Sequence, residues 1–427
     1  MIKRYLNPTK PEWPILVERS LPDDSAIEAR VENIINEVKE GGDDAVRRLI
    51  KDIDGVELSS LEVTDEERRE AFDLVPQELK SAISNAVRNI TLFHMAQRFE
   101  PVRVETSPGV LCVQRAVPIR RVGLYAPGGT APLFSTVLML AAPAKVAGCE
   151  EVILCTPANR EGKVAPAVLY AAMICGVHRV FKVGGAQAVA AMAYGTDTIP
   201  AVDKIFGPGN RYVTKAKEIV SRKVAIDMPA GPSEVLVVAD ETAVPAFVAS
   251  DLLSQAEHGT DSQAILVCSS EAVADAVCVE LEAQLAKLSR RDIAIKALAN
   301  SRVVVLPEND DRIEFVNLYA PEHLIISTRD PWGVSARVTA AGSVFIGNYT
   351  PESAGDYASG TNHTLPTSGW ARSHSGVNLD SFVRKITYQE ITREGIEALS
   401  KIIIPMAEAE GLDAHAQAAA IRVDECK

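Results

Sequence analysis

The chain has 427 residues, of which 47% are hydrophobic and 24% are charged, and its net charge is −13. This size and composition are typical of a soluble globular protein with two or three domains. The negative charge argues against nucleic acid or an anionic membrane as the main partner, although a local helix N-terminus can still bind a small anionic cofactor. No stretch resembles a signal peptide or a transmembrane helix, and the seven cysteines include no CxxC pair. We therefore expect a cytoplasmic protein with buried thiols and no disulfide bonds.

The N-terminal part is predicted to be an arm followed by helices. Residues 1–25 contain several prolines, which would break a long helix. Apolar residues then recur with helical spacing over 25–53, 64–75 and 76–99. Thr64 and the glutamate three residues later match the pattern of a capping box.

From Arg121 onward, short apolar strands alternate with helices in two successive sets. The first set of strands is expected within 120–129, 150–157, 178–185 and 202–210, and the second within 233–240, 262–269, 301–307, 322–328 and 342–348. Such alternation predicts an α/β protein with two doubly wound, Rossmann-like parallel sheets covered by helices on both faces. Ligands are expected at the carboxyl ends of the strands.

The predicted division of the chain has four parts. They are an arm at 1–25, a first Rossmann-like domain at 26–124 plus 233–377, a second at 125–232, and a helical tail at 378–427. The tail is too short to bury a core of its own, so we expect it to pack on the body or on a partner chain.

Three glycine turns follow predicted strands, although the GxGxxG dinucleotide pattern is absent. They read YAPGGTAP, VGGAQA and FGPGNRY. Each places backbone amides near the start of a helix, which is how an anion such as a pyrophosphate is held. One such turn is usually only a connecting loop, whereas three in one domain modestly favour a nucleotide-type ligand.

The segment DLLSQAEHG ends an apolar helical pattern with Gln255 and His258, and two interpretations are open. A histidine in a last turn followed by Gly259 suits an ordinary helix C-terminus. Residues three apart also share a helix face, so both side chains could reach one metal ion. Taken alone, the pattern favours the first interpretation.

Other polar residues are candidates for chemistry. Glu322 and His323 are adjacent where a turn enters a predicted strand, and they could supply general base catalysis if both lie on the turn. The loop 347–376 contains Asp356 and His363, and loops of this length tend to be functional or disordered; its aromatic residues and prolines favour order. Asp, Gln and His side chains together offer the oxygen and nitrogen ligands that suit zinc.

Six motifs occur in the order found in histidinol dehydrogenases, and the chain resembles that family from about residue 25 to its C-terminus. The motifs are GPGNRYV, AGPSEVLV, DLLSQAEHG, APEHL, GDYASGTNHTLPT and EAEGLDAHA. The resemblance implies oxidation of L-histidinol through L-histidinaldehyde to L-histidine with two NAD, the last step of histidine biosynthesis. It also implies a homodimer with shared active sites and one zinc ion per subunit.

The resemblance implies a role for each of several side chains. The implied zinc ligands are Gln255, His258, Asp356 and His415, the last from the tail of the other subunit. The implied catalytic pair is Glu322 and His323. The implied substrate contacts are Ser233, His363 and Glu410, together with His323 and the four zinc ligands. The implied NAD contacts are Tyr125, Gln187 and Asn210. The first Rossmann-like domain would thus carry zinc and the second would bind NAD, while His374 has no implied role.

Rival interpretations differ in substrate or in reaction class. A related zinc- and NAD-dependent dehydrogenase of another small polar alcohol would keep the fold and the catalytic pair, but Ser233, His363 and Glu410 favour histidinol. A zinc hydrolase would use Glu322 to activate water and would need no NAD. A catalytically inactive binding protein would not need the intact set of ligands and bases.

Overall fold

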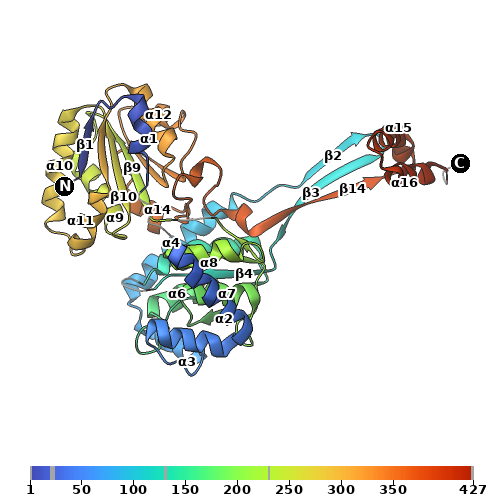
Figure 1. The fold of residues 1–427 in the computed structure, drawn as a ribbon, viewed down its shortest axis with the longest axis horizontal. Helices are drawn as coiled ribbons and strands as arrows, with labels where there is room; N and C mark the ends of the chain where they lie inside the picture. The colour runs from blue at the N-terminus through green and yellow to red at the C-terminus, as the bar shows by residue number, and fades with distance from the viewer. Residues whose placement is uncertain (1, 20–24, 129–131, 229–230, 425–427) are drawn as a thin grey trace.

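The computed structural model describes residues 2–19, 25–128, 132–228 and 231–424. Most of the predicted arm is therefore described, but part of the turn YAPGGTAP and Cys426 lie outside these residues. The described part contains two parallel sheets, each packed among helices, and a long antiparallel ribbon that leads away from them (Figure 1).

The larger sheet has six parallel strands in the order β1-β11-β10-β9-β12-β13. Its strands are β1 (Lys3–Leu6), β9 (Glu234–Ala239), β10 (Gln263–Cys268), β11 (Arg302–Val305), β12 (His323–Ser327) and β13 (Ser343–Ile346). The central strands are buried along their length because helices cover both faces, which explains their nearly continuous Val, Ile and Leu runs. The predicted arm contributes β1 as an edge strand, so it is part of this sheet.

Several helices of the described chain pack around the larger sheet. They include α1 (Trp13–Leu16), α9 (Pro245–Ala256), α10 (Glu271–Leu285), α11 (Arg291–Ala299), α12 (Asn309–Tyr319) and α13 (Pro331–Ser335). Leu252 of α9 joins the core on one face of the sheet, and Phe315 of α12 joins the core on the other.

The smaller sheet has five parallel strands in the order β6-β5-β4-β7-β8. Its strands are β4 (Arg121–Tyr125), β5 (Glu151–Cys155), β6 (Arg179–Phe181), β7 (Lys204–Phe206) and β8 (Ala225–Ile226). In both sheets the first strand of the set lies in the centre, and the chain moves outward on one side before it crosses to the other. This is the doubly wound, Rossmann-like order, so the predicted fold class is confirmed.

The helices of the N-terminal region lie against the smaller sheet. The helices around this sheet are α2 (Ser25–Leu49), α3 (Asp65–Leu74), α4 (Gln77–Met95), α5 (Phe134–Ala147), α6 (Pro166–Cys175), α7 (Gly185–Tyr194) and α8 (Arg211–Val220). Helix α2 packs on α7 and α8, α3 packs on α6, and α4 packs on α5. The capping box at Thr64 is confirmed at the start of α3.

This packing differs from the predicted division, which grouped residues 26–124 with 233–377. An amphipathic pattern shows that a helix has an apolar face, but it does not show which sheet that face covers. Strand β4, at the centre of the smaller sheet, also falls within 26–124. We propose that residues 25–95 and 121–232 form one domain and that residues 2–19 and 233–377 form the other.

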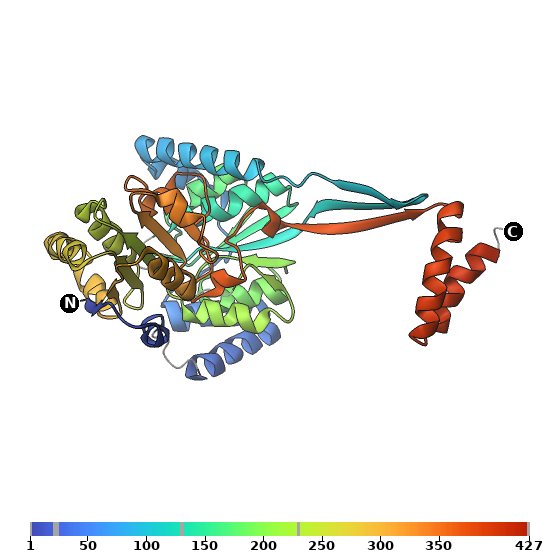
Figure 2. The same ribbon diagram turned by 90° about the horizontal axis from the view of Figure 1, so that it is seen from above.

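The C-terminal tail leaves the body on a three-stranded antiparallel ribbon. The ribbon has the order β14-β3-β2 and is built from β2 (Val102–Ser107), β3 (Val110–Pro118) and β14 (Val383–Ile391). The helices α15 (Arg393–Ala409) and α16 (Asp413–Asp424) pack on each other at its far end, well away from both sheets (Figures 1 and 2). The prediction of a wholly helical tail is wrong for β14, because its β-branched and aromatic residues pair with β3.

The structure can be compared with the predictions about transmembrane helices and about the cysteines. No helix of the described residues is long and apolar enough to cross a membrane. The six cysteines at 112, 149, 155, 175, 268 and 278 are free thiols, as predicted, and four of them are buried.

Candidate active site

Glu322 and His323 lie together at the amino end of β12, which runs between β9 and the edge strand β13 of the six-stranded sheet. Glu322 directly precedes the strand, and His323 is its first residue. Oε2 of Glu322 lies 3.6 Å from Nδ1 of His323, and each residue is only 5% exposed. The turn therefore lets neighbouring residues share one site, which a regular strand would not allow. The pair lies at the amino end of the strand, whereas the sequence analysis expected ligands at the carboxyl ends.

The backbone of the neighbouring strand β9 holds this pair in place. The amide of Glu234 donates a 2.8 Å hydrogen bond to Oε2 of Glu322, and its carbonyl oxygen lies 3.3 Å from Nδ1 of His323. Ser233 immediately precedes Glu234, so the predicted substrate contact lies at the same end of the sheet. With Nδ1 facing the carbonyl, the Nε2 atom of His323 is left for chemistry.

Arg19, from the N-terminal arm, pairs with the side chain of Glu234. Nε and Nη2 of Arg19 donate to the two carboxylate oxygens at 2.8 and 2.9 Å, and the guanidinium also lies over the ring of Tyr319. The hydroxyl of Tyr319 donates to the same carboxylate at 3.2 Å. Glu234 is buried, and the side chain of Arg19 is 14% exposed. The sequence analysis missed Arg19, since an arginine in a proline-rich arm gives no local signal.

Gln255 and His258 lie at the end of α9. The helix is capped at Glu257, two residues earlier than Gly259, so Gln255 occupies the last turn and His258 lies just beyond it. Gln255 is 0% exposed, and within the described chain neither its Oε1 nor its Nε2 has a hydrogen-bond partner. Burying an amide without partners costs about 1–3 kcal/mol. A buried amide of this kind indicates a group that the chain alone does not supply.

Asp356 lies on α14 (Glu352–Tyr357), which packs directly against the sheet. A side chain at Gly355 would place its Cβ 2.7 Å from the ring of Phe345 on β13, so only glycine permits this approach. Nδ1 of His363 is 3.0 Å from the backbone oxygen of Asp356, which brings the long loop back onto the helix. Two residues predicted from the 347–376 loop thus meet.

His258, Glu352 and Asp356 form a cluster of potential metal ligands. One nitrogen or oxygen atom from each lies within 4.8 Å of the others. Nε2 of His323 is 3.8 Å from Oδ1 of Asp356, so the Glu322–His323 pair borders this cluster. The sequence analysis missed Glu352; its position four residues before Asp356 on the same helix was the available signal.

The carboxylates around His323 dominate the electrostatics of the site. Burial lowers the pKa of His323, but Glu352 and Glu322 outweigh it and raise that pKa to about 10. Burial raises the pKa of Glu352 to about 8, although His323 opposes the shift. Burial lowers the pKa of His363. Such a concentration of buried acids favours a cation at this place.

His415 and Glu410 are not brought to this cluster within the chain. Glu410 caps the end of α15 and His415 lies on α16, and both are exposed at the far end of the ribbon. Figures 1 and 2 show from two directions that this end is distant from the sheets. Exposed apolar side chains on the two helices include Ile402, Met406 and Ile421.

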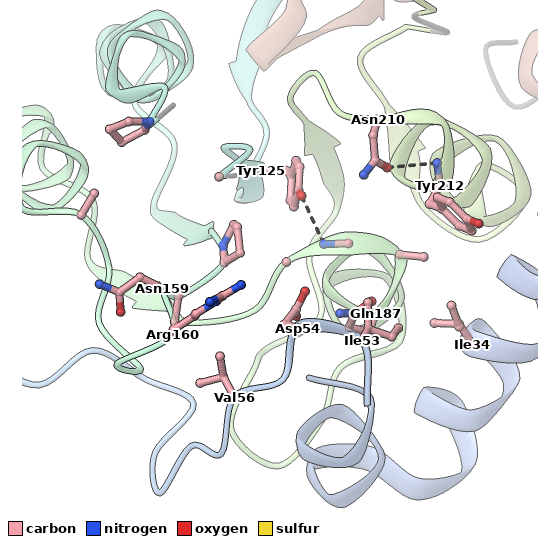
Figure 3. A pocket seen from close by; sticks show the side chains of 18 of the residues that line it. Ile34, Ile53, Asp54, Val56, Tyr125, Asn159, Arg160, Gln187, Asn210 and Tyr212 are labelled. Carbon is pink, nitrogen blue, oxygen red and sulfur yellow. Dashed lines mark hydrogen bonds between the residues drawn. The ribbon is translucent and has the colours of Figure 1, made fainter. Parts of the chain in front are cut away.

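A separate cavity of about 780 Å³ lies at the carboxyl ends of the strands of the smaller sheet (Figure 3). The three predicted cofactor contacts, Tyr125, Gln187 and Asn210, all line it. The glycine turn at 184–185 also lines the cavity, and so do Asp54 and Arg160, which the sequence analysis missed.

Some polar groups that line the cavity have hydrogen-bonding capacity that no other described residue satisfies. The amide of Gly185 donates to the hydroxyl of Tyr125 at 3.1 Å, which leaves the hydroxyl proton available. Burial raises the pKa of Tyr125 to about 12, so this proton stays in place. Nε2 of Gln187 is buried and has no partner among the described residues. Asn210 caps α8 through its side-chain oxygen.

The sequence profile of histidinol dehydrogenase matches residues 17–423. The chain belongs to the histidinol dehydrogenase family. A histidinol dehydrogenase of Bacteroides fragilis is 57% identical over 421 residues, which cover 98% of each chain. One from Bacteroides thetaiotaomicron is 55% identical over 428 residues, 100% of each chain. The crystal structure of histidinol dehydrogenase from Elizabethkingia anophelis is 48% identical with a TM-score of 0.97, covering 100% of this chain and 98% of that one.

Proposed function

We propose that the chain is a zinc-dependent histidinol dehydrogenase that oxidises L-histidinol through L-histidinaldehyde to L-histidine with two NAD. Its membership of the histidinol dehydrogenase family supports this, and the six motifs extend over most of the matched region. The observation that carries the proposal is the juxtaposition of the Glu322–His323 pair with the cluster at His258 and Asp356.

The donor set fits zinc. Gln255, His258 and Asp356 would hold the ion, with His415 from the tail of a second copy as the fourth ligand. The partnerless amide of Gln255 is explained if its oxygen binds a cation. Nitrogen and oxygen donors without thiolate suit a catalytic zinc site. When bound, the ion supplies a Lewis acid that orients the substrate and polarises it.

The cavity of the smaller sheet fits NAD. Its position at the carboxyl ends of a doubly wound sheet is where such folds bind dinucleotides. Tyr125 and Gln187 offer hydrogen-bonding groups that the chain leaves unused, and the 184–185 turn offers backbone amides at the start of α7. NAD supplies the acceptor for the hydride in each oxidation.

In the first oxidation His323 serves as the base. Its Nε2 accepts the hydroxyl proton of histidinol while the carbon-bound hydrogen leaves with its electron pair, which gives the aldehyde. Two of the carboxylates that raise the pKa of His323, those of Glu352 and Asp356, belong to the proposed cation site. A bound cation would therefore lower that pKa toward the range of an effective base. Ser233 and His363, with Glu410 from the second copy, are proposed to hold the substrate in this position.

In the second oxidation Glu322 activates water. Its carboxylate accepts a proton from water as the water oxygen adds to the aldehyde carbon, and the resulting hydrate loses a second hydride to give the carboxylic acid. The proximity of Glu322 and His323 allows one site to perform both steps. If the aldehyde stays bound between the first and the second oxidation, it is not lost to solvent.

We further propose that the active protein is a homodimer in which tails are exchanged. The ribbon carries α15 and α16 away from the body, and their apolar side chains remain exposed there. His258 is the exposed member of the metal cluster, so the cluster is open to a ligand from another chain. Reciprocal exchange satisfies two-fold symmetry and gives two equivalent sites.

The test is to mix the purified protein with L-histidinol and NAD and to count NADH formed per histidine, with and without a chelator. Two NADH per histidine, lost on chelation and restored by zinc, are expected. Zinc-dependent NADH formation from other small polar alcohols but not from histidinol would indicate the related dehydrogenase. Hydrolysis without any NAD requirement would indicate the hydrolase.

A further inference from the structure

Glu352 is a buried carboxylate that the described chain leaves without a hydrogen-bond donor. It is the first residue of α14 and is 1% exposed. Neither Oε1 nor Oε2 has a hydrogen-bond partner among the described residues, and Nδ1 of His323 lies 3.8 Å from Oε1. A carboxylate in such a place is costly unless a cation is beside it.

The position of Glu352 relative to the other donors is close to that of a coordination shell. Its donor atom and those of His258 and Asp356 lie within 4.8 Å of one another. Ligand atoms about 2.0–2.2 Å from zinc lie at most about 4.4 Å from each other, so small side-chain adjustments would close the cluster on one ion.

The charge of the site points to the same role. The ligand set proposed above contains one anion, Asp356, because glutamine and neutral histidine carry no charge. A zinc ion in that set would leave a buried excess of one positive charge. Glu352 would make the site neutral, and neutral buried clusters avoid the large desolvation cost of an uncompensated charge.

We propose that Glu352 supplies the second negative charge of the zinc site and strengthens zinc binding. The proposal rests on the zinc-dependent function given above. It makes Glu352 a metal-site residue, in addition to its contact with His323.

The experiment measures zinc affinity directly. Zinc is removed from the purified protein by dialysis against a chelator, and the dissociation constant is obtained by competition with a chromophoric zinc indicator. Glu352→Gln keeps the shape and removes the charge, and zinc is expected to bind about 10–100-fold more weakly. Glu352→Asp keeps the charge and is expected to bind zinc more tightly than Glu352→Gln does.

Glu322→Gln is the matched control. Glu322 is also buried and also borders His323, but its Oε2 already accepts a hydrogen bond from the Glu234 amide. Its substitution is expected to leave the zinc dissociation constant close to that of the wild type. Equal loss of zinc affinity in both variants would contradict a specific role for Glu352.

Thermal unfolding of the zinc-free proteins distinguishes a metal role from a purely structural one. Glu352 has no hydrogen-bond donor among the described residues, so zinc-free Glu352→Gln should be close in stability to the zinc-free wild type. Lower stability together with unchanged zinc affinity would show that Glu352 serves only as an ion-pair partner of His323, and would overturn the proposal. Failure of the wild type itself to bind zinc is a separate result, which would reject the zinc dependence on which the proposal rests.

Discussion

Nδ1 of His323 lies 3.8 Å from Oε1 of Glu352, while Nε2 of the same imidazole lies 3.8 Å from Oδ1 of Asp356. The ring thus stands between two carboxylates that also border the proposed ion. Occupancy of the metal site and proton affinity of the base are therefore coupled through shared groups. This coupling makes the proposed catalytic pair, Glu322 and His323, the first place to test.

His323→Asn and Glu322→Gln should affect different half-reactions. Loss of the base is expected to lower the rate of histidinol oxidation by about 10²–10⁴-fold, whereas Glu322→Gln should mainly slow the conversion of histidinaldehyde to histidine. NADH formation is measured separately with histidinol and with histidinaldehyde as the starting substrate. Normal turnover of both substrates by both variants would contradict the assigned roles.

Exchange of tails predicts complementation between two inactive variants. His323→Asn damages the body and His415→Ala damages the tail, and in a mixed dimer one site receives both intact parts. Equal mixing after reversible unfolding is expected to restore about a quarter of wild-type activity, because half of the dimers are mixed and each has one good site. If each tail served its own body, the mixture would stay inactive.

The ion pair between Arg19 and the buried Glu234 predicts a strong coupling between the two side chains in stability. Arg19→Met leaves the Glu234 carboxylate buried without its cation and should lower the free energy of unfolding by about 3–5 kcal/mol. The double variant with Glu234→Gln removes both charges and should recover much of that loss. Urea unfolding of both variants, monitored by circular dichroism, measures the difference. Additive losses would show that the two side chains do not act as a pair.

Gln187→Leu tests the assignment of the cavity to NAD. Loss of a hydrogen bond to the cofactor is expected to raise KM for NAD about 5–10-fold, corresponding to about 1–1.5 kcal/mol, with little change in KM for histidinol. Initial rates with each substrate varied in turn provide the measurement. An effect on histidinol alone would place the cofactor elsewhere.

Much of the fold followed from local sequence patterns. The buried strands have the Val- and Ile-rich runs of parallel sheets, and the alternation of strands and helices gave the doubly wound class. The sequence patterns did not show which sheet each helix packs on. Helices α2 and α4 have clear apolar faces, but only the tertiary structure shows that these faces cover the smaller sheet. Strand β14 was also missed, because it is stabilised by β3, which precedes it by more than 260 residues.

Only part of the candidate site could be predicted, because some of its residues are recognised only by their tertiary contacts. Motifs led to Gln255, His258, Asp356 and the catalytic pair, and the structure brings His258, Asp356 and the pair together. Glu352 and Arg19 belong to no such motif. Their importance comes from burial and from distances to residues remote in sequence, which one sequence does not report.

The ribbon fixes how far the terminal helices stand from the body. Strands β3 and β14 each have nine residues and run about 30 Å at the usual rise of an antiparallel strand. Two residues inserted into each ribbon strand would move α15 and α16 outward by about 7 Å, while a single-residue insertion would turn their attachment to the opposite face. Strand length thus sets the distance between the terminal helices and the body, and only insertions of two residues at a time change that distance without reversing the face of attachment.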